Sequence, residues 1–318
     1  MKRVLAFLAI AFSAAAWAQS YPAQPIKLIV PFPPGGGADV AARIVAQELG
    51  QQLGQSIVVE NVSGAGGSIG TARAAQAPAD GYTLFVGTPS THGTNPAVYP
   101  KLPYDPVKDF APIALISTSP FILITRADFK AKSVKELIAE ARAHPGQLNY
   151  ASFGNGSINH LIGELFLSMT DTKAGHVPYR GGAPALADLM AGRVDYTFDG
   201  SASLDQVRAG KVRAIAVGTP KRWNVLPDVP TVAEAGVPGF EAFTWYGLFA
   251  PAATPRPIVE LLNTKLNAAL QTASCKEAFA KQAIDPAGGP PEVLVRQVQN
   301  EIGKWTKVAR EKGISIKE

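Results

Sequence analysis

Residues 26–39 read IKLIVPFPPGGGAD, and this stretch predicts a buried strand followed by a glycine turn and a helix. The apolar run Ile26–Val30 predicts the strand, and the amphipathic pattern of Asp39–Leu49 predicts the helix. Three consecutive glycines let the backbone pass close to a ligand, and Asp39 is expected to cap the helix. Amides at a helix N-terminus carry the positive end of the helix dipole, so the turn suits a carboxylate. The same residues also fit a tight turn that binds nothing.

Short β-rich runs alternate with helical patterns through most of the chain, which predicts an α/β protein with parallel or mixed sheets covered by helices. A length of 318 residues is enough for two domains of ordinary size. The predicted strands are 26–30, 57–62, 83–86, 111–116, 121–125, 149–152, 176–177, 195–198, 213–217 and 243–250. The predicted helices are 39–49, 68–75, 134–143, 159–169, 183–191, 204–209, 258–270, 275–282 and 292–311. If the last helices return to the first domain, the chain crosses between domains near 117–120 and again near 240–245.

A second strand-to-helix loop repeats the chemistry of the first. Ser152-Phe153-Gly154-Asn155-Gly156-Ser157 lies between a predicted strand and a predicted helix, and His160 follows it closely. If each domain presents one such loop to a shared cleft, backbone N–H groups would hold a dicarboxylate or an amino acid between them. That geometry describes a clamshell.

Two further segments either line the same cleft or are ordinary loops. One is the glycine run Gly64–Gly70, and the other is the polar stretch Thr88–Asn95, which includes Ser90 and His92.

The motifs of nucleotide-binding proteins and hydrolases give one alternative function. Val40 stands where the third glycine of a dinucleotide fingerprint belongs, and no Lys-Ser or Lys-Thr follows a glycine run as in a P-loop. Gly66-Gly67-Ser68-Ile69-Gly70 does match the G-x-S-x-G nucleophile elbow. A secreted serine hydrolase that uses Ser68 is therefore the alternative, although no histidine is paired with this serine by the sequence.

Composition argues against several other classes of protein. The four histidines, His92, His144, His160 and His176, have no metal-ligand spacing, so neither a metal nor another cofactor is expected. The Lys and Arg residues are scattered without a basic cluster, which argues against nucleic acid as a partner.

The first residues predict a secretory signal. Lys2 and Arg3 precede the apolar run Val4–Ala16, and Ala16-Trp17-Ala18 supplies small residues for cleavage near Ala18. Residues 1–18 would then be the signal peptide, and the protein would be released into the periplasm. Loss of the two signal cations leaves 28 Lys and Arg against 25 Asp and Glu, which is close to neutral.

In these residues the chain resembles the Bug family, the TctC-like extracytoplasmic solute-binding receptors of tripartite tricarboxylate transporters. The resemblance covers essentially the whole chain after the signal. It is carried, in order, by Pro25–Asp39, Asn61–Gly70, Pro78–Leu84, Asn95-Pro96, Tyr150–His160, Val177–Gly182 and Leu226–Thr231.

The resemblance implies a two-lobed periplasmic binding protein of type II, or Venus-flytrap, architecture, in which each lobe is a mixed β-sheet flanked by helices. Lobe 1 would comprise residues 19–118 plus 242–318, and lobe 2 residues 119–241. Arg180 would be either a carboxylate clamp or a solvated charge. The expected ligand-binding residues are Pro34, Gly35, Gly36, Gly37, Thr88, Ser90, His92, Ser152, Phe153, Gly154, Asn155, Gly156, Ser157, His160, Tyr179 and Asp199.

The expected function is capture of a small carboxylate by hinge closure, without catalysis. A dicarboxylate or tricarboxylate, an acidic amino acid and an aromatic acid all fit. The expected partners are the membrane subunits of a tripartite tricarboxylate transporter or a sensor kinase, and a monomer is expected.

Overall fold

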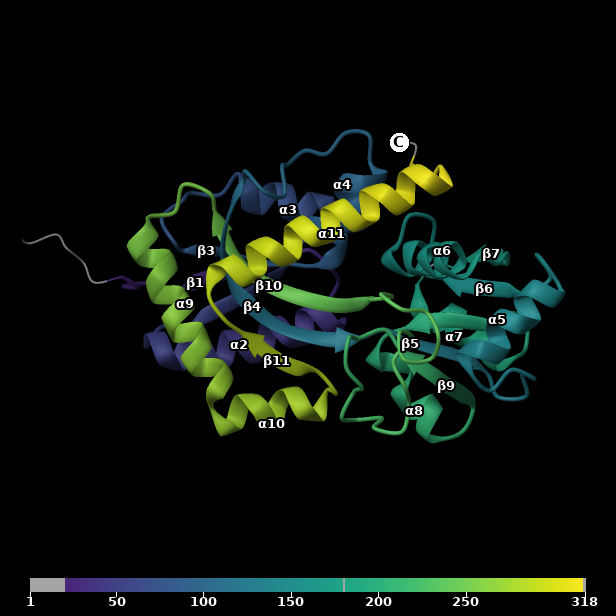
Figure 1. The fold of residues 1–318 in the computed structure, drawn as a ribbon. Coiled ribbons are helices and arrows are strands. Elements are labelled where there is room, and N and C mark those ends of the chain that lie inside the picture. The colour runs from purple at the N-terminus through teal and green to yellow at the C-terminus, as the bar shows by residue number, and fades with distance from the viewer. Residues whose placement is uncertain (1–20, 180, 317–318) are drawn as a thin grey trace, which may run out of the picture.

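The computed structural model describes residues 21–179 and 181–316, which form two β-sheets flanked by helices (Figure 1). The six-stranded sheet has the order β11-β4-β10-β3-β1-β2, and the five-stranded sheet has the order β7-β6-β8-β5-β9. The first contains β1 (Ile26–Val30), β2 (Ile57–Asn61), β3 (Thr83–Gly87), β4 (Phe110–Pro120), β10 (Phe243–Pro251) and β11 (Asp285–Gly288). The second contains β5 (Ile122–Arg126), β6 (Asn149–Ser152), β7 (Gly175–Pro178), β8 (Tyr196–Asp199) and β9 (Val212–Val217). Both sheets mix parallel and antiparallel pairs, which confirms the predicted fold class.

The helices follow the predicted segments closely. They are α2 (Gly37–Leu53), α3 (Ser68–Ala75), α4 (Asn95–Val98), α5 (Val134–Ala143), α6 (Ile158–Thr170), α7 (Gly182–Met190), α8 (Leu204–Arg208), α9 (Arg256–Gln271), α10 (Ala273–Lys281) and α11 (Pro291–Lys312). Short helical turns at η1 (Ala65–Gly67), η2 (Ser90–Thr94) and η3 (Ser201–Ser203) precede α3, α4 and α8.

Helices cover both faces of the six-stranded sheet. Leu28 of β1 packs in one cluster with residues of α2, α9 and α10, whereas its neighbour Ile29 packs in another with residues of α3 and α11. Successive side chains of a strand point to opposite faces, so a strand buried on both faces has to be apolar throughout. This is why four of the five residues of β1 are apolar and buried, and only Lys27 is exposed.

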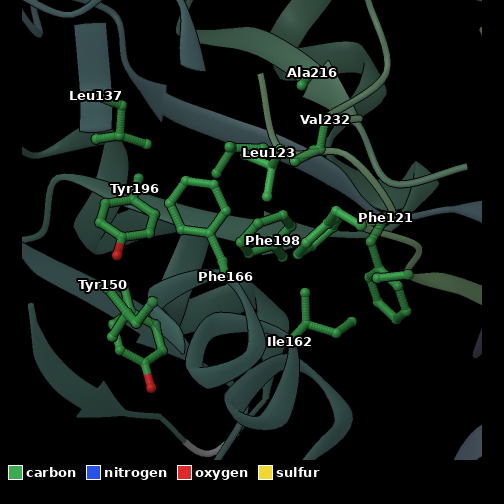
Figure 2. Packing of buried hydrophobic residues seen from close by; sticks show 14 of the residues in the cluster. Phe121, Leu123, Leu137, Tyr150, Ile162, Phe166, Tyr196, Phe198, Ala216 and Val232 are labelled. Atoms are coloured by element: carbon green, nitrogen blue, oxygen red, sulfur yellow. The ribbon is translucent and has the colours of Figure 1, made fainter. Parts of the chain in front are cut away.

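The five-stranded sheet is built in the same way. Leu123 of β5 packs with α5 and α6, and its neighbours Ile122 and Ile124 pack with α7 and α8. Figure 2 shows the first of these cores, where Phe166 of α6 lies against Tyr196 and Phe198 of β8. The ring centroids are 6.4 and 5.7 Å apart, within the range of edge-to-face aromatic pairs.

The polypeptide passes directly from one sheet to the other at two adjacent places. β4 of the six-stranded sheet continues into β5 through Phe121, and β10 begins at Phe243, which pairs with Pro120 at the end of β4. Gly218 lies between the two segments, because its N–H donates to Phe121 O (2.7 Å) and its carbonyl accepts from Ala242 N–H (2.8 Å). The division of the chain into residues 19–118 plus 242–318 and residues 119–241 stays a prediction, which this strand membership supports.

One strand and one turn differ from the sequence predictions. β11 was not expected, since its Asp-Pro-Ala-Gly sequence is unfavourable for a central strand; it lies at a sheet edge and pairs with β4 alone, where proline is tolerated. The polar stretch from Thr88 to Asn95 is a π-helical turn leading into α4 rather than an open loop.

The predicted signal peptide, residues 1–18, lies outside the described residues. Within the part of the chain that is described, no helix combines the length and apolar character needed to cross a membrane.

Gly218 should tolerate no side chain. A Cβ at this position would collide with the carbonyl oxygen of Ala242 and lie 3.3 Å from that of Phe121, and both obstacles are backbone atoms. We expect Gly218→Ala to lower the free energy of unfolding by about 2 kcal/mol or more in urea denaturation. The matched control is Gly303→Ala within α11, where a Cβ meets nothing within 4 Å. This change should be neutral or stabilise by about 0.5–1 kcal/mol, because alanine is the better helix former. Equal unfolding midpoints for the two variants would contradict this account of the crossing.

Candidate ligand-binding site

A cavity of about 500 Å³ lies between the two lobes, a size typical of small-molecule sites. The six-stranded lobe contributes the loop before α2, the turn after β3 and the start of β10. The five-stranded lobe contributes the first residues of α6 and α7. The described lining residues are Phe32, Pro33, Pro34, Gly36, Gly37, Ala38, Thr88, Pro89, Ser90, Ile158, Gly181, Gly182, Thr244 and Tyr246.

The N-terminus of α2 presents free backbone amides to this cavity. The first intrahelical bond runs from Val40 N–H to Gly36 O (3.0 Å), which leaves the N–H groups of Gly37, Ala38 and Asp39 without an intrahelical acceptor. No side chain caps the helix at Gly36. The phenol of Tyr246 approaches Gly37 so closely that a Cβ there would clash with its oxygen. Amides and phenol therefore form one group of donors.

The buried carboxylate of Asp39 holds the loop before α2 and does not line the cavity. Asp39 Oδ2 accepts from Gly35 N–H and from Arg43 Nε, both at 2.9 Å. Asn61 Nδ2 donates to Asp39 Oδ1 (2.9 Å) and to Phe32 O (3.0 Å). Burial acts to raise the pKa of Asp39, but the hydrogen bonds from Arg43, Gly35 and Asn61 outweigh burial and lower it. Asp39 is thus in the first turn of α2 and reaches back to the loop, instead of being the N-terminal cap that the sequence predicted.

The loop before α6 is held by a second set of side chains. Ser152 Oγ accepts from Gly154 N–H (3.2 Å) and lies 2.6 Å from His176 Nε2. His160 Nδ1 accepts from Gly156 N–H (3.1 Å), and Ser157 caps the helix by accepting from His160 N–H (3.3 Å). The rings of His160 and His176 stack with centroids 3.9 Å apart. Ser152, His160 and His176 support the loop, and none of the three lines either cavity.

The stacked histidines are neutral near pH 7. Burial, together with the neighbouring His160, lowers the pKa of His176 to about 4. Burial also lowers the pKa of His160, against the opposing effect of Glu164. A neutral His160 is required for its Nδ1 to accept from Gly156 N–H.

A second chamber of about 370 Å³ adjoins the main cavity and shares Phe32, Ser90 and Ile158 with it. Of the predicted ligand-binding residues, Pro34, Gly36, Gly37, Thr88 and Ser90 line the main cavity. Ser90, Phe153, Asn155, Gly156 and Ser157 line the second chamber. Gly35, His92, Ser152, Gly154, His160, Tyr179 and Asp199 line neither.

His92 was predicted to contact the ligand, but the structure places it in the core. Its ring is fully buried, stacks on Phe249 with centroids 4.4 Å apart and contacts Thr91 Oγ1 through Nδ1 (2.9 Å). Burial lowers the pKa of His92 to about 3. The residue is a neutral part of the core, because the π-helical turn directs it inward.

Tyr179 and Asp199 also have contacts away from the cavity. The phenol of Tyr179 donates to Asp188 Oδ2 on α7 (2.8 Å). Asp199 is 4% exposed, and its Oδ1 accepts from Gly200 N–H (2.7 Å). Burial raises the pKa of Asp199 to about 6, despite the hydrogen bonds from Gly200 and Ser203.

Several lining residues were missed in the sequence prediction. Gly182 begins α7 without a side-chain cap, so it repeats the strand-glycine-helix pattern and was recognisable; Gly181 beside it was expected to face the cleft if Arg180 is a solvated or domain-bridging charge. Thr244 and Tyr246 lie on β10, where no local pattern marks them as cavity residues. The predicted role of Arg180 falls outside the described residues.

The described residues that line the two chambers are uncharged and include several possible hydrogen-bond donors. None of the described lining residues carries a charged side chain. Residues at the first turns of α2, α6 and α7 line the main cavity together with Thr88, Ser90, Thr244 and Tyr246. Helix N-termini with free amides stabilise an anion without a counter-charge.

Residues 41–314 match TctC, the tripartite tricarboxylate transporter family receptor. The chain belongs to this family. An adipate-bound protein from R. palustris is 42% identical, with a TM-score of 0.82 over 93% of this chain and 99% of that chain. MatC from Rhodopseudomonas palustris, with bound malate, is 38% identical, with a TM-score of 0.77 over 91% and 99%. The periplasmic binding protein BugD is 34% identical, with a TM-score of 0.78 over 93% and 99%.

Membership of this receptor family confirms two predictions. The two-lobed periplasmic binding-protein fold is shared with these solved structures, and the chain is a solute-binding receptor rather than an enzyme. The hydrolase alternative is wrong. Ser68 begins α3, is 5% exposed, and its Oγ accepts from Asn95 Nδ2 (3.3 Å).

Asp39 should be needed for both stability and ligand binding in this receptor. Asp39→Asn replaces a carboxylate oxygen with an NH₂ group that would face the donors of Gly35 or Asn61. We expect a loss of about 1–3 kcal/mol in the free energy of unfolding, measured in urea. The control is Asp205→Asn, whose side chain is 89% exposed and 4.0 Å from Arg208; its effect should stay within about 0.5 kcal/mol. A stable Asp39→Asn variant would show that the loop does not depend on this carboxylate.

His176 should make the receptor less stable in acid. Unfolded histidine titrates near 6.5 and folded His176 near 4, so the unfolded chain binds the proton first as the pH falls. The contribution to stability is complete above pH 6.5 and is lost as the pH drops toward 4. We expect wild-type melting temperature to fall relative to that of His176→Gln between pH 7 and pH 5. Groups with a raised pKa, such as Asp199, stabilise the folded state in acid. They are present in both proteins, so their effect cancels in the difference between the two melting temperatures. Parallel melting curves across this range would contradict the prediction.

Proposed function

We propose that this receptor captures a small carboxylate in the cavity between its lobes and delivers it to the membrane subunits of a tripartite tricarboxylate transporter. The observation that carries the proposal is that the uncapped first turns of α2 and α7, together with Ile158 at the start of α6, line one cavity. The donors come from both lobes, so a bound carboxylate would contact both at once.

The proposed contacts are neutral hydrogen bonds to an ionised ligand. Each such bond contributes about 1.5–3 kcal/mol, so about three to five well-aligned bonds would supply the roughly 8 kcal/mol of micromolar affinity. The residues proposed to contact the ligand are Pro34, Gly36, Gly37, Thr88, Ser90, Phe153, Asn155, Gly156, Ser157, Gly181, Gly182, Thr244 and Tyr246. Gly35, Ser152, Gly154 and His160 would position the loops.

A dicarboxylate is the ligand class that the two chambers favour. One carboxylate would bind at the amides of α2 and α7, and the other end would extend into the second chamber with Asn155 and Asn159. The adipate and malate bound by two relatives support this class. Tricarboxylates, acidic amino acids and aromatic acids complete the panel to test.

Binding would close the two lobes about the crossings next to Gly218, with lobes of residues 19–118 plus 242–318 and 119–241. A ligand that contacts both lobes favours the closed form over the open one by the difference in its binding free energy. The closed form would dock on the transporter, or on a sensor kinase.

The basic and apolar start of the sequence supports export to the periplasm with cleavage near Ala18. A free monomer would leave the lobes able to move and to reach a membrane partner.

A thermal-shift screen tests the function directly. The mature protein is unfolded, refolded to remove carried-over ligand, and melted with monocarboxylates, dicarboxylates, tricarboxylates and amino acids. A ligand that binds the folded state raises the melting temperature by mass action. A shift with one carboxylate class supports the proposal, and calorimetric titration then gives Kd. Flat curves across all carboxylates would overturn it.

Tyr246 provides the sharpest single test of the cavity. Tyr246→Phe keeps the packed ring and removes the hydroxyl beside Gly37, so affinity for the carboxylate found in the screen should fall about 5- to 10-fold. Tyr82→Phe is the matched control, because the Tyr82 oxygen accepts from Ala23 N–H and does not line the cavity. Equal Kd values for the two variants would show that the Tyr246 phenol does not contact the ligand.

A further inference from the structure

The second chamber is closed on one side by the C-terminal tail. Helix α11 starts on the six-stranded sheet, passes α4 and reaches the side of the molecule where α6 lies (Figure 1). It ends at Gly313, whose left-handed conformation (φ 63°) turns the chain. The next residues, 314–316, then run beside the cleft.

The tail is attached to both lobes. Ile316 N–H donates to Val98 O at the end of α4 (2.8 Å), which ties the tail to the six-stranded lobe. Lys312 Nζ lies 3.5 Å from Glu164 Oε2 on α6, which ties the end of α11 to the other lobe. These two contacts fix the tail across the boundary between the lobes.

The side chain of Ile316 faces the ligand-binding loop of α6. A Cβ at Gly156 would lie only 2.6 Å from Ile316 Cδ1, so the glycine at this position leaves the space that the isoleucine fills. Ile316 is half-buried and forms part of the wall of the second chamber, opposite the loop that carries Asn155 and Gly156. The chamber adjoins the main cavity, with Phe32, Ser90 and Ile158 lining both.

We infer that Ile316 is a specificity-determining residue, which limits how far the end of a bound carboxylate extends from the amides of α2 and α7. This inference rests on the proposed function, because it concerns the ligand of the same cleft. A short ligand such as succinate would end before the second chamber. A longer α,ω-dicarboxylate would place its distal end against Ile316.

The experiment compares succinate, adipate and suberate as ligands of the full mature protein, with Kd measured by calorimetric titration. Ile316→Ala enlarges the chamber, which should favour the longer suberate. The ratio of Kd for succinate to Kd for suberate should therefore rise about ten-fold. Ile316→Trp should shift the same ratio in the opposite direction. A ratio is used because a variant that only loosens the fold would weaken all three ligands together.

Ile314→Ala is the matched control. Ile314 is also half-buried, lies in the same tail and packs against the same core cluster as Ile316, but it does not line the chamber. Its ratio of Kd values should equal that of the wild type. Melting temperatures of all variants show whether each is folded, and Ile316→Val provides a milder change in the same direction.

The outcomes separate the two proposals. If wild type binds dicarboxylates and the ratio is unchanged in both Ile316→Ala and Ile316→Trp, the inference about Ile316 is wrong while the proposed function stands. If wild type binds none of the three dicarboxylates, the proposed dicarboxylate function fails and the inference fails with it. Opposite shifts in the two variants, with no shift in Ile314→Ala, support both.

Discussion

Backbone amides left without a side-chain cap at the first turns of α2 and α7 are the feature on which the rest of this structure depends. Most helices satisfy some of these amides with a side chain at the N-terminal cap. In α2 and α7 the capping positions are Gly36 and Gly181, which have no side chain to offer. The amides therefore stay available in the cavity. The absence of a side chain at these glycines also leaves room for a ligand to approach the backbone closely.

Side-chain contacts fix the loops before α2 and α6, although only α6 has a side-chain cap, from Ser157. Asp39 and Asn61 bind the turn before α2 on the side away from the cavity, and Ser152 and His160 do so for the turn before α6. Donors held in place before the ligand arrives cost less ordering entropy on binding. Asp39, His160 and His176 contact these loops but line neither cavity.

The connections between the lobes are as important as the loops. β4 continues into β5, β10 returns beside it, and Gly218 is packed against both segments by backbone hydrogen bonds. Helix α11 forms a third link, since its end contacts α6 and its tail bonds to α4. Side chains of α4 and α11 also pack in one buried cluster with those of α6. The tail carries Ile316 to the wall of the second chamber.

The sequence by itself determined the strand-glycine-helix units at both loops, because apolar runs, glycines and helical periodicity act locally. It thereby placed Gly36, Gly37 and the loop of Asn155 and Gly156 at the cavity. Only the tertiary structure decided the rest. Tyr246 reaches the cavity from a strand that pairs with distant segments, and Ile316 reaches the second chamber from the end of the chain. His92 lies in a polar stretch, yet the turn buries it against Phe249. In each case the direction of the side chain depends on packing between segments far apart in sequence, which no local pattern encodes.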